Sequence, residues 1–118
     1  MEPQDTPPVQ SPPRKIVIDN EAFGYGNIEA WANIIRSYRE QHPQHLVLLL
    51  YHSEPVVNLT MLFKMGKPVD RDAFQLSVAA RDQDFRHLAK LHRLLVEGAG
   101  PDFQKFLVPE LHRVLKLF

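Results

Sequence analysis

The chain has 118 residues, an apolar fraction of 44%, a formal net charge of zero and a pI near 7. This length fits one domain and permits a hydrophobic core, because a chain of this size buries roughly two-thirds of the surface that its unfolded form exposes. The neutral balance argues against nucleic acid or an anionic membrane as the main partner, since proteins that neutralise many phosphates carry a basic excess. The sequence contains no cysteine, which excludes disulfides, thiolate metal sites and cysteine nucleophiles.

The first 14 residues are predicted to form a disordered tail. They contain five prolines, and Val9 is their only aliphatic side chain, so they bury too little surface to offset the entropy of ordering. They include no hydrophobic segment typical of a secretory signal. The longest apolar run of the chain, Leu46 to Tyr51, is much shorter than the ~20 residues that span a bilayer. We therefore expect a flexible tail followed by a single domain over residues 15–118, in the cytoplasm and away from membranes.

A strand, a helix and a second strand are predicted in succession. Residues 15–19 contain a run of three β-branched residues, which predicts a strand, and a loop with two glycines follows. A helix is then predicted from Asn27, a good N-cap, to about Gln41. Residues 46–51 form an apolar run between two proline-containing turns, which is typical of a strand buried on both faces. Apolar residues with helical spacing mark one face of the helix: Ile28, Trp31, Ile34, Ile35 and Tyr38. This succession favours a right-handed βαβ unit with parallel strands, in which the second strand is central.

The next two segments alternate apolar and polar residues. Residues 57–65 and 73–79 both follow this period of two, and together they predict an antiparallel hairpin with one solvated face. Ser53, Pro55 and Gly66 are also typical start and stop signals of a helix, so residues 56–65 remain open between strand and helix.

The C-terminal third is predicted to be helical. Asp82 or Asp84 is expected to cap a helix that ends near Gly98, and helical structure restarts after Pro101 with an interruption at Pro109. The element order is then β-α-β-β-β-α-α. This order predicts an α/β (α+β) fold, a two-layer sandwich with a mixed sheet of about four strands.

No catalytic, metal or cofactor site is predicted. His52, Ser53 and Glu54 follow a central strand, where ligands of open α/β sheets bind, but neighbouring residues of an extended chain point to opposite faces. No glycine-flanked nucleophile elbow surrounds the serine, and we interpret this cluster as the turn that ends the strand. His87 and His92 have the wrong helical spacing for a metal pair, and no H-E-x-x-H motif is present.

A possible ligand loop lies between the first strand and the first helix. Its glycines would let the backbone approach a ligand closely, its aromatic rings could stack on one, and the helix N-terminus could bind an anion. The loop lacks the third glycine of a dinucleotide fingerprint and the lysine of a phosphate-binding loop. A tight turn whose aromatic residues fold into the core is therefore the favoured interpretation. The candidate residues are Phe23, Gly24, Tyr25, Gly26 and Asn27.

A basic stripe is predicted on the helix that starts near Asp84. Arg86, Lys90 and Arg93 share one face, which could touch phosphate. Because Asp82 and Asp84 lie beside them, we interpret this stripe as a solvated helix face.

The C-terminus is apolar up to its final residue, although chain ends are usually polar. Either the domain's own sheet covers this surface, or a partner does. We expect a non-catalytic interaction or assembly module that binds itself or another protein through this C-terminus, an exposed sheet edge, or both. The predicted interaction residues are Leu111, Val114, Leu115, Leu117 and Phe118. The alternatives are a regulatory domain that binds a small ligand or anion at the 19–27 loop, and a small enzyme that uses Asp19, His52 or Glu54.

Overall fold

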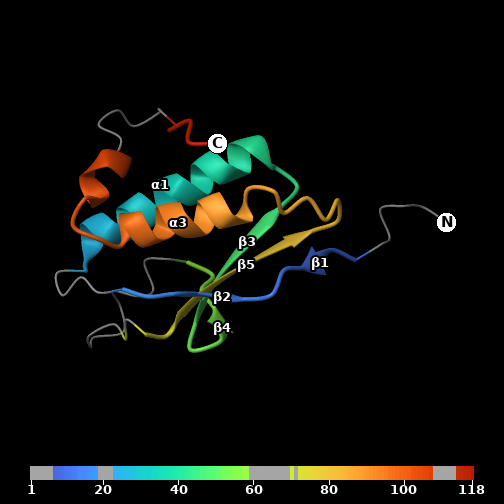
Figure 1. The fold of residues 1–118 in the computed structure, drawn as a ribbon, viewed down its shortest axis with the longest axis horizontal. Coiled ribbons are helices and arrows are strands. Elements are labelled where there is room, and N and C mark those ends of the chain that lie inside the picture. Colours follow the sequence, from blue (N-terminus) through green and yellow to red (C-terminus); the bar gives the residue numbers. More distant parts are fainter. Residues whose placement is uncertain (1–6, 19–22, 59–69, 71, 108–113) are drawn as a thin grey trace.

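In the computed structural model, which describes residues 7–18, 23–58, 70, 72–107 and 114–118, two helices lie on one face of a curled five-stranded sheet (Figure 1). The two-layer α+β prediction is therefore confirmed. The elements are β1 (Val9–Gln10), β2 (Arg14–Ile16), α1 (Tyr25–Gln41), β3 (Leu46–Tyr51), β4 (Glu54–Pro55), β5 (Phe74–Ala80), α3 (Leu88–Gly98) and the short 3-10 helix η2 (Phe103–Phe106).

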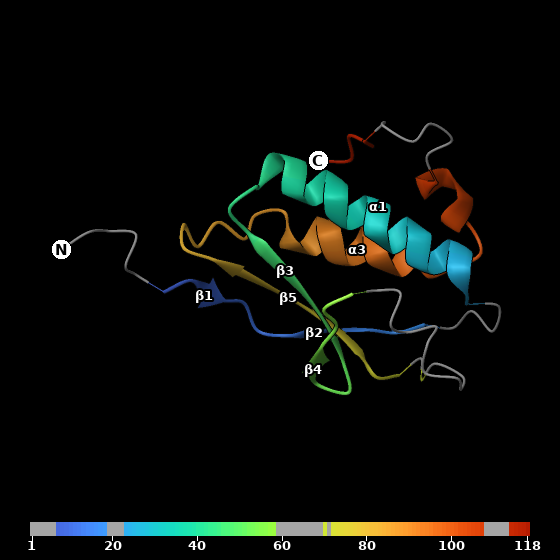
Figure 2. The same cartoon turned by 180° about the vertical axis from the view of Figure 1, so that it is seen from behind.

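Strand β5, and not β3, is the centre of the sheet. β3 pairs with one side of β5, β1 and β2 pair with its other side, and β4 pairs with the outer side of β3 (Figure 2). Every one of these pairings is antiparallel, so the predicted mixed sheet is wrong. β2 and β3 do run in the same direction, as a βαβ unit requires, but β5 lies between them. The sequence pattern cannot reveal such an inserted strand.

β5 is buried on both faces, in contrast to the predicted hairpin with a solvated face. Phe74, Leu76 and Val78 face the helices, and Ser77 on the other face is also fully buried. The strand was expected to pair with residues 57–65. Its observed partners are instead β3, β1 and β2, while Val57 and Asn58 belong to no strand and residues 59–65 lie outside the described residues.

The predicted disordered tail, residues 1–14, is too long, because strand β1 and the first residue of β2 lie within it. Between β1 and β2, three residues oppose two residues of β5, because Gln10 faces Ala79 and Arg14 faces Leu76. This is a β-bulge, and it coincides with two prolines that cannot donate to the ladder. Beside these prolines, the Ser11 hydroxyl accepts the N–H of Val78 at 2.9 Å, and the Ser11 N–H donates to the Val78 carbonyl at 2.8 Å. A buried serine thus anchors a segment whose composition alone predicts disorder.

His52 and Ser53 form the two-residue turn between β3 and β4. Their φ angles are 52° and 65°, and the turn joins the facing pair Tyr51 and Glu54. Positive φ at both central residues is the mark of the type I′ turn, whose twist suits a tight hairpin. The interpretation of this cluster as a turn is confirmed.

Helix α1 buries the predicted face, with Ile28, Trp31, Ile34 and Tyr38 each less than 5% exposed. It begins at Tyr25, so Asn27 is its third residue and not its N-cap. The Asn27 side chain still serves the helix start, since its Oδ1 accepts the backbone N–H of Gly24 at 3.0 Å.

Helix α3 begins at Leu88, later than predicted. The carboxylates of Asp82 and Asp84 each accept a backbone N–H two residues further on, which stabilises turns and not a helix start. Between them Gln83 has a φ of 55°. After α3, the predicted helical restart is the 3-10 helix η2 as far as residue 107; residues 108–113 lie outside the described ranges, and Val114–Phe118 belongs to no helix.

Candidate functional site: an apolar groove beside an open sheet edge

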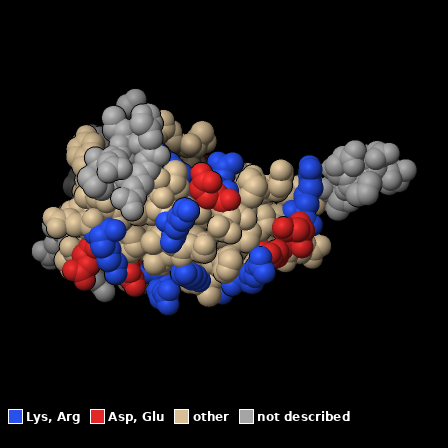
Figure 3. Space-filling model, turned by 90° about the horizontal axis from the view of Figure 1, so that it is seen from above, with Lys and Arg blue, Asp and Glu red and all other residues tan. Residues whose placement is uncertain are grey.

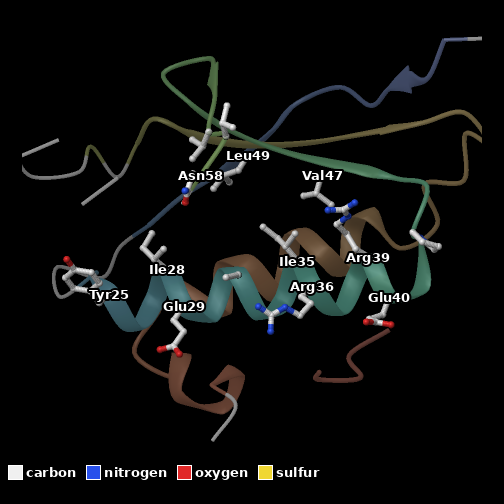
Figure 4. Close-up of a pocket in the computed structure, with 14 residues that line it drawn as sticks. Tyr25, Ile28, Glu29, Ile35, Arg36, Arg39, Glu40, Val47, Leu49 and Asn58 are labelled. Carbon is white, nitrogen blue, oxygen red and sulfur yellow. The ribbon is translucent and has the colours of Figure 1, made fainter. Parts of the chain in front are cut away.

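A groove of about 1260 Å³ runs between α1 and the β3–β4 side of the sheet. Figure 4 shows Ile28 and Ile35 pointing from α1 toward Val47 and Leu49 of the sheet. The walls of the groove are mainly apolar, and charged residues of α1 line its rim. The lining residues are Tyr25, Ile28, Glu29, Ala32, Ile35, Arg36, Arg39, Glu40, Pro43, Val47, Leu49, Val56, Val57 and Asn58.

The groove follows from two periodicities. On α1, Ile28, Ala32 and Ile35 recur at intervals of three and four residues and therefore share one side of the helix. On β3, Val47 and Leu49 alternate onto the face that is turned toward α1. Ala32, near the middle of the helix, has the smallest side chain of this set.

The outer edge of β3 is open along part of the groove. β4 pairs only with Leu50 and Tyr51, and the N–H of Val56 adds one bond to the carbonyl of Leu49. Antiparallel pairing alternates sides, so the N–H and C=O of Val47 point away from β5 toward this edge. Within the described ranges no strand pairs with that stretch. Unpaired main-chain groups of this kind can accept a strand from another chain.

The charges on the rim have no partner within the part of the chain that the structure describes. Glu29, Arg36, Arg39 and Glu40 are exposed, and none forms an ion pair or hydrogen bond with another described residue. Glu29 and Glu40 point away from the sheet, whereas Arg39 reaches toward Val47 (Figure 4). An apolar floor with a rim of unpaired charges is the usual composition of a protein-binding surface.

The opposite side of α1 is hydrogen-bonded to α3. The Trp31 indole N–H donates to the Leu95 carbonyl at 2.7 Å, and the Asn27 amide donates to the carbonyls of Gly98 and Gly100. Asn33 donates likewise to the Phe106 carbonyl. Gly98 and Phe106 are the last residues of α3 and η2, where carbonyls lack a partner within the helix, so α1 side chains supply one, whereas the Leu95 carbonyl also accepts the backbone N–H of Ala99 at 3.0 Å. This side of α1 is an internal interface.

A second cluster joins the C-terminal end of α1 to the β5–α3 connection. The Tyr38 hydroxyl lies 2.8 Å from His45 Nδ1, and His45 Nε2 lies 2.9 Å from Asp82. His42 stacks on His45, and its Nε2 lies 2.8 Å from His87 Nδ1. With the His45 proton on Nε2, Tyr38 donates to His45 and His45 donates to Asp82. Tyr38 is fully buried and the His45 side chain nearly so, whereas Asp82 at the end of this chain of hydrogen bonds is exposed.

The surroundings shift three pKa values in this cluster. Burial, followed by the charges of Asp84 and Asp82, raises the pKa of Tyr38 to about 12. Burial and the neighbouring imidazoles of His45 and His87 lower the pKa of His42. The backbone N–H of Asp84 and then the His45 side chain lower the pKa of Asp82. The cluster therefore favours neutral His42 and ionised Asp82 at neutral pH.

The residues of the predicted ligand loop serve mainly the packing of the domain. The Phe23 ring lies 5.2 Å from Trp31 and 6.2 Å from Phe74, and Asn27 is hydrogen-bonded as described above. A Cβ on Gly26 would lie 2.2 Å from the Phe103 ring, so this glycine permits close packing. Tyr25, which is 74% exposed, lines one end of the groove instead.

The predicted C-terminal interaction residues lie against the domain itself. Leu115, Leu117 and Phe118 are half-buried and pack on the core, and the Leu117 N–H donates to the Ser37 hydroxyl at 2.8 Å. The Phe118 ring meets Tyr38 edge-on. Val114 is half-buried beside this segment, and Leu111 lies outside the described residues.

The residues of the enzyme alternative do not assemble into a site in the described ranges. His52 and Glu54 belong to the exposed turn region, where His52 pairs loosely with Asp70 at 3.4 Å, and Asp19 lies outside those ranges. Among the described residues no group of three or more His, Cys, Asp or Glu could hold a metal ion. The Arg86, Lys90 and Arg93 stripe lies on α3, and Figure 3 shows basic and acidic atoms interspersed over the helical side of the molecule.

The groove and the His42–His45–His87 cluster are the features that sequence reasoning missed. Ile35 was assigned to the core face of the helix, although Ile28, Ala32 and Ile35 together make a second apolar stripe. The unusually wide apolar arc of α1 is the signal that could have revealed the groove. No local sequence pattern reveals the histidine cluster, because His87 lies far along the chain from His42 and His45.

The fold and the groove define a small two-layer α+β domain with an apolar groove beside an open sheet edge. The chain belongs to the family described as "Uncharacterised Treponema protein C-terminal domain", whose model matches residues 9–105. It is 37% identical over 103 residues to an uncharacterised protein of Treponema pallidum (strain Nichols), a match that covers 87% of this chain and 29% of that relative. The chain thus spans less than a third of that relative's length. No solved structure matches. In the described residues, no helix is both long and apolar enough to cross a membrane.

Proposed function

We propose that this domain is a non-catalytic protein-interaction module whose docking site is the groove between α1 and the open edge of β3. The observation that carries the proposal is a combination on one side of the molecule: an apolar floor, rim charges without an ion-pair partner among the described residues, and main-chain groups of Val47 that no described strand pairs. A polypeptide matches all three, because it can bury apolar side chains, form ion pairs and donate main-chain hydrogen bonds at once. A cytoplasmic location, which the cysteine-free sequence favours, is part of this proposal.

We propose the sheet edge, and not the C-terminus, as the docking site. Leu115, Leu117 and Phe118 are already half-buried against α1, which leaves less surface for a partner. Ile35, Val47 and Val57 instead line an open groove, and Val57 is 89% exposed. Apolar side chains held on a rigid helix and strand offer a partner more contact area at a smaller entropic cost.

Selection from a displayed peptide library tests this function, with the protein kept at high dilution. The wild-type chain should enrich peptides with alternating or helically spaced apolar residues. Ala32→Arg should lose this enrichment because it places a charge and extra bulk in the middle of the groove. Ala89→Arg, the same change on an exposed position of α3, is the matched control and should retain it. Enrichment that survives Ala32→Arg, or that Ala89→Arg abolishes equally, would contradict the proposal.

A further inference from the structure

We propose that the groove binds an extended, acidic peptide segment of a partner protein, which adds to the open edge of β3 as a further strand and places a carboxylate beside Arg39. This inference rests on the docking function proposed above and specifies the partner. Its basis is that free main-chain groups and a positive charge lie together at one end of the groove.

The main-chain groups of Val47 require an extended partner. The Leu49 carbonyl accepts the Val56 N–H on the outer side of β3. Main-chain groups of alternate strand residues point to the same side, so the N–H and C=O of Val47 also point outward, where no described strand pairs with them. A helix satisfies its main-chain groups internally, whereas an extended peptide can exchange two hydrogen bonds with Val47.

The charge beside this open edge is positive. Arg39 reaches toward Val47, whereas both acidic residues of the rim, Glu29 and Glu40, point away from the sheet (Figure 4). Neither Arg36 nor Arg39 forms an ion pair with a residue that the structure describes. An acidic side chain in the partner complements this end of the groove, because a carboxylate can accept two parallel hydrogen bonds from one guanidinium.

Strand geometry brings both interactions to the same peptide residue. The Val47 side chain lies on the face that is turned toward α1, and residues directly opposite in an antiparallel pair share one face. The peptide residue that exchanges hydrogen bonds with Val47 therefore directs its side chain toward Arg39. Its two neighbours point to the other face, where Leu46 is 54% exposed. The recognised segment is thus an acidic residue between apolar residues.

The charge of the partner is tested by peptide selection, followed by fluorescence polarisation of the most enriched peptide. The wild type should enrich peptides that carry an acidic residue between apolar ones. Arg39→Glu should weaken binding of the enriched peptide about tenfold or more, because repulsion replaces attraction. The same variant should prefer the peptide in which lysine replaces the acidic residue.

Arg93→Glu, the same change at an exposed position of α3, is the matched control and should bind the acidic peptide as the wild type does. Equal affinity of the wild type and Arg39→Glu for that peptide would overturn the proposed contact.

Strand addition is tested by residue-resolved amide hydrogen exchange. Saturation with the enriched peptide should slow exchange of the Val47 N–H about tenfold or more, since this group gains an acceptor. The Leu48 N–H, which points toward β5, is the internal control and should change little. A peptide that is N-methylated at the paired residue should bind more weakly. Unchanged exchange at Val47 would overturn strand addition.

The two proposals can fail separately. Enriched peptides that depend on Ala32 but lack an acidic residue and leave Val47 unprotected would overturn this inference, while the docking function would stand. A helical peptide that leaves Val47 unprotected would overturn strand addition even where Arg39→Glu weakens its binding. If no enriched peptide depends on Ala32, both proposals are overturned.

Discussion

The two sides of α1 differ in how their side chains are partnered. Toward α3, Asn27, Trp31 and Asn33 each donate to a main-chain carbonyl, and each of these side chains is buried. Toward the groove, Ala32 and Ile35 are half-buried, and the charges at the rim have no ion-pair partner among the described residues. The first side specifies the fold of the chain, because its polar groups are satisfied only in this arrangement. The second side leaves its surface available to a partner.

This contrast separates stability from binding along a single helix. Substitutions on the α3 side should mainly change the free energy of unfolding. Substitutions on the groove side should mainly change association. Four variants or conditions test the separation, ordered by the expected size of their effect on stability.

Trp31→Ala should have the largest effect. Trp31 is fully buried and packs against the rings of Phe23 and Phe74, so its removal should lower the free energy of unfolding by about 3–5 kcal/mol. Urea denaturation followed by circular dichroism measures the loss. Ile35→Ala, on the half-buried groove side, is the comparison and should cost clearly less. Equal losses would show that the two sides of α1 do not differ.

Asn27→Ala should have the next largest effect. It leaves the carbonyls of Gly98 and Gly100 without the amide that binds them, which should lower the free energy of unfolding by about 1–3 kcal/mol. Gln41→Ala, at an exposed position of the same helix, should be nearly neutral in the same denaturation experiment. A neutral Asn27→Ala would mean that water replaces the amide without cost.

Acidification should produce a smaller, graded effect. The pKa of His42 is lowered in the folded state, so the unfolded chain binds the proton more readily below the ordinary value of 6.5. Stability should therefore be fully present above pH 6.5 and fall as the pH drops from there through the folded pKa, by no more than about 1.4 kcal/mol per pH unit for one proton. Denaturation at several pH values should show a shallower decline in His42→Gln. An identical slope in that variant would assign the effect to another group.

Ala32→Arg should have the smallest effect on stability, within about 0.5 kcal/mol, because the new side chain extends into the open groove. Thermal unfolding of dilute protein measures it, with Ala89→Arg as the control. A large loss from Ala32→Arg alone would indicate that the groove is filled in the native monomer. The same variant would then say nothing about docking, so this measurement should precede the peptide selection.

The helices were largely predictable from sequence, because local periodicity determines them. The burial of Ile28, Trp31, Ile34 and Tyr38 follows directly from helical spacing. The start of α3 was misplaced because Asp82 and Asp84 cap turns as readily as they cap helices. The turn at His52 and Ser53 was identified from its position after an apolar run, although its left-handed geometry was not.

The sheet order and the groove were not predictable in the same way. Local pattern reveals that β2, β3 and β5 are strands, but the insertion of β5 between the other two is a tertiary fact. The groove depends on which strand edge stays unpaired, and the histidine cluster depends on two segments, 38–45 and 82–87, that meet only in the folded chain. Ser11 shows why composition alone could not predict order in this segment. The proline-rich composition suggests disorder, whereas the buried Ser11 hydroxyl is hydrogen-bonded to β5 and holds the segment in the sheet.

The bulge at Pro12 and Pro13 has a consequence for the size of any assembly. The two long sides of the described sheet are unequal, because β3 offers free main-chain groups at one side, whereas the opposite side carries two prolines and a kink. A sheet that can be extended from both sides stacks into filaments without limit. With only one extendable side, any association of this domain through its sheet edge would end at a pair.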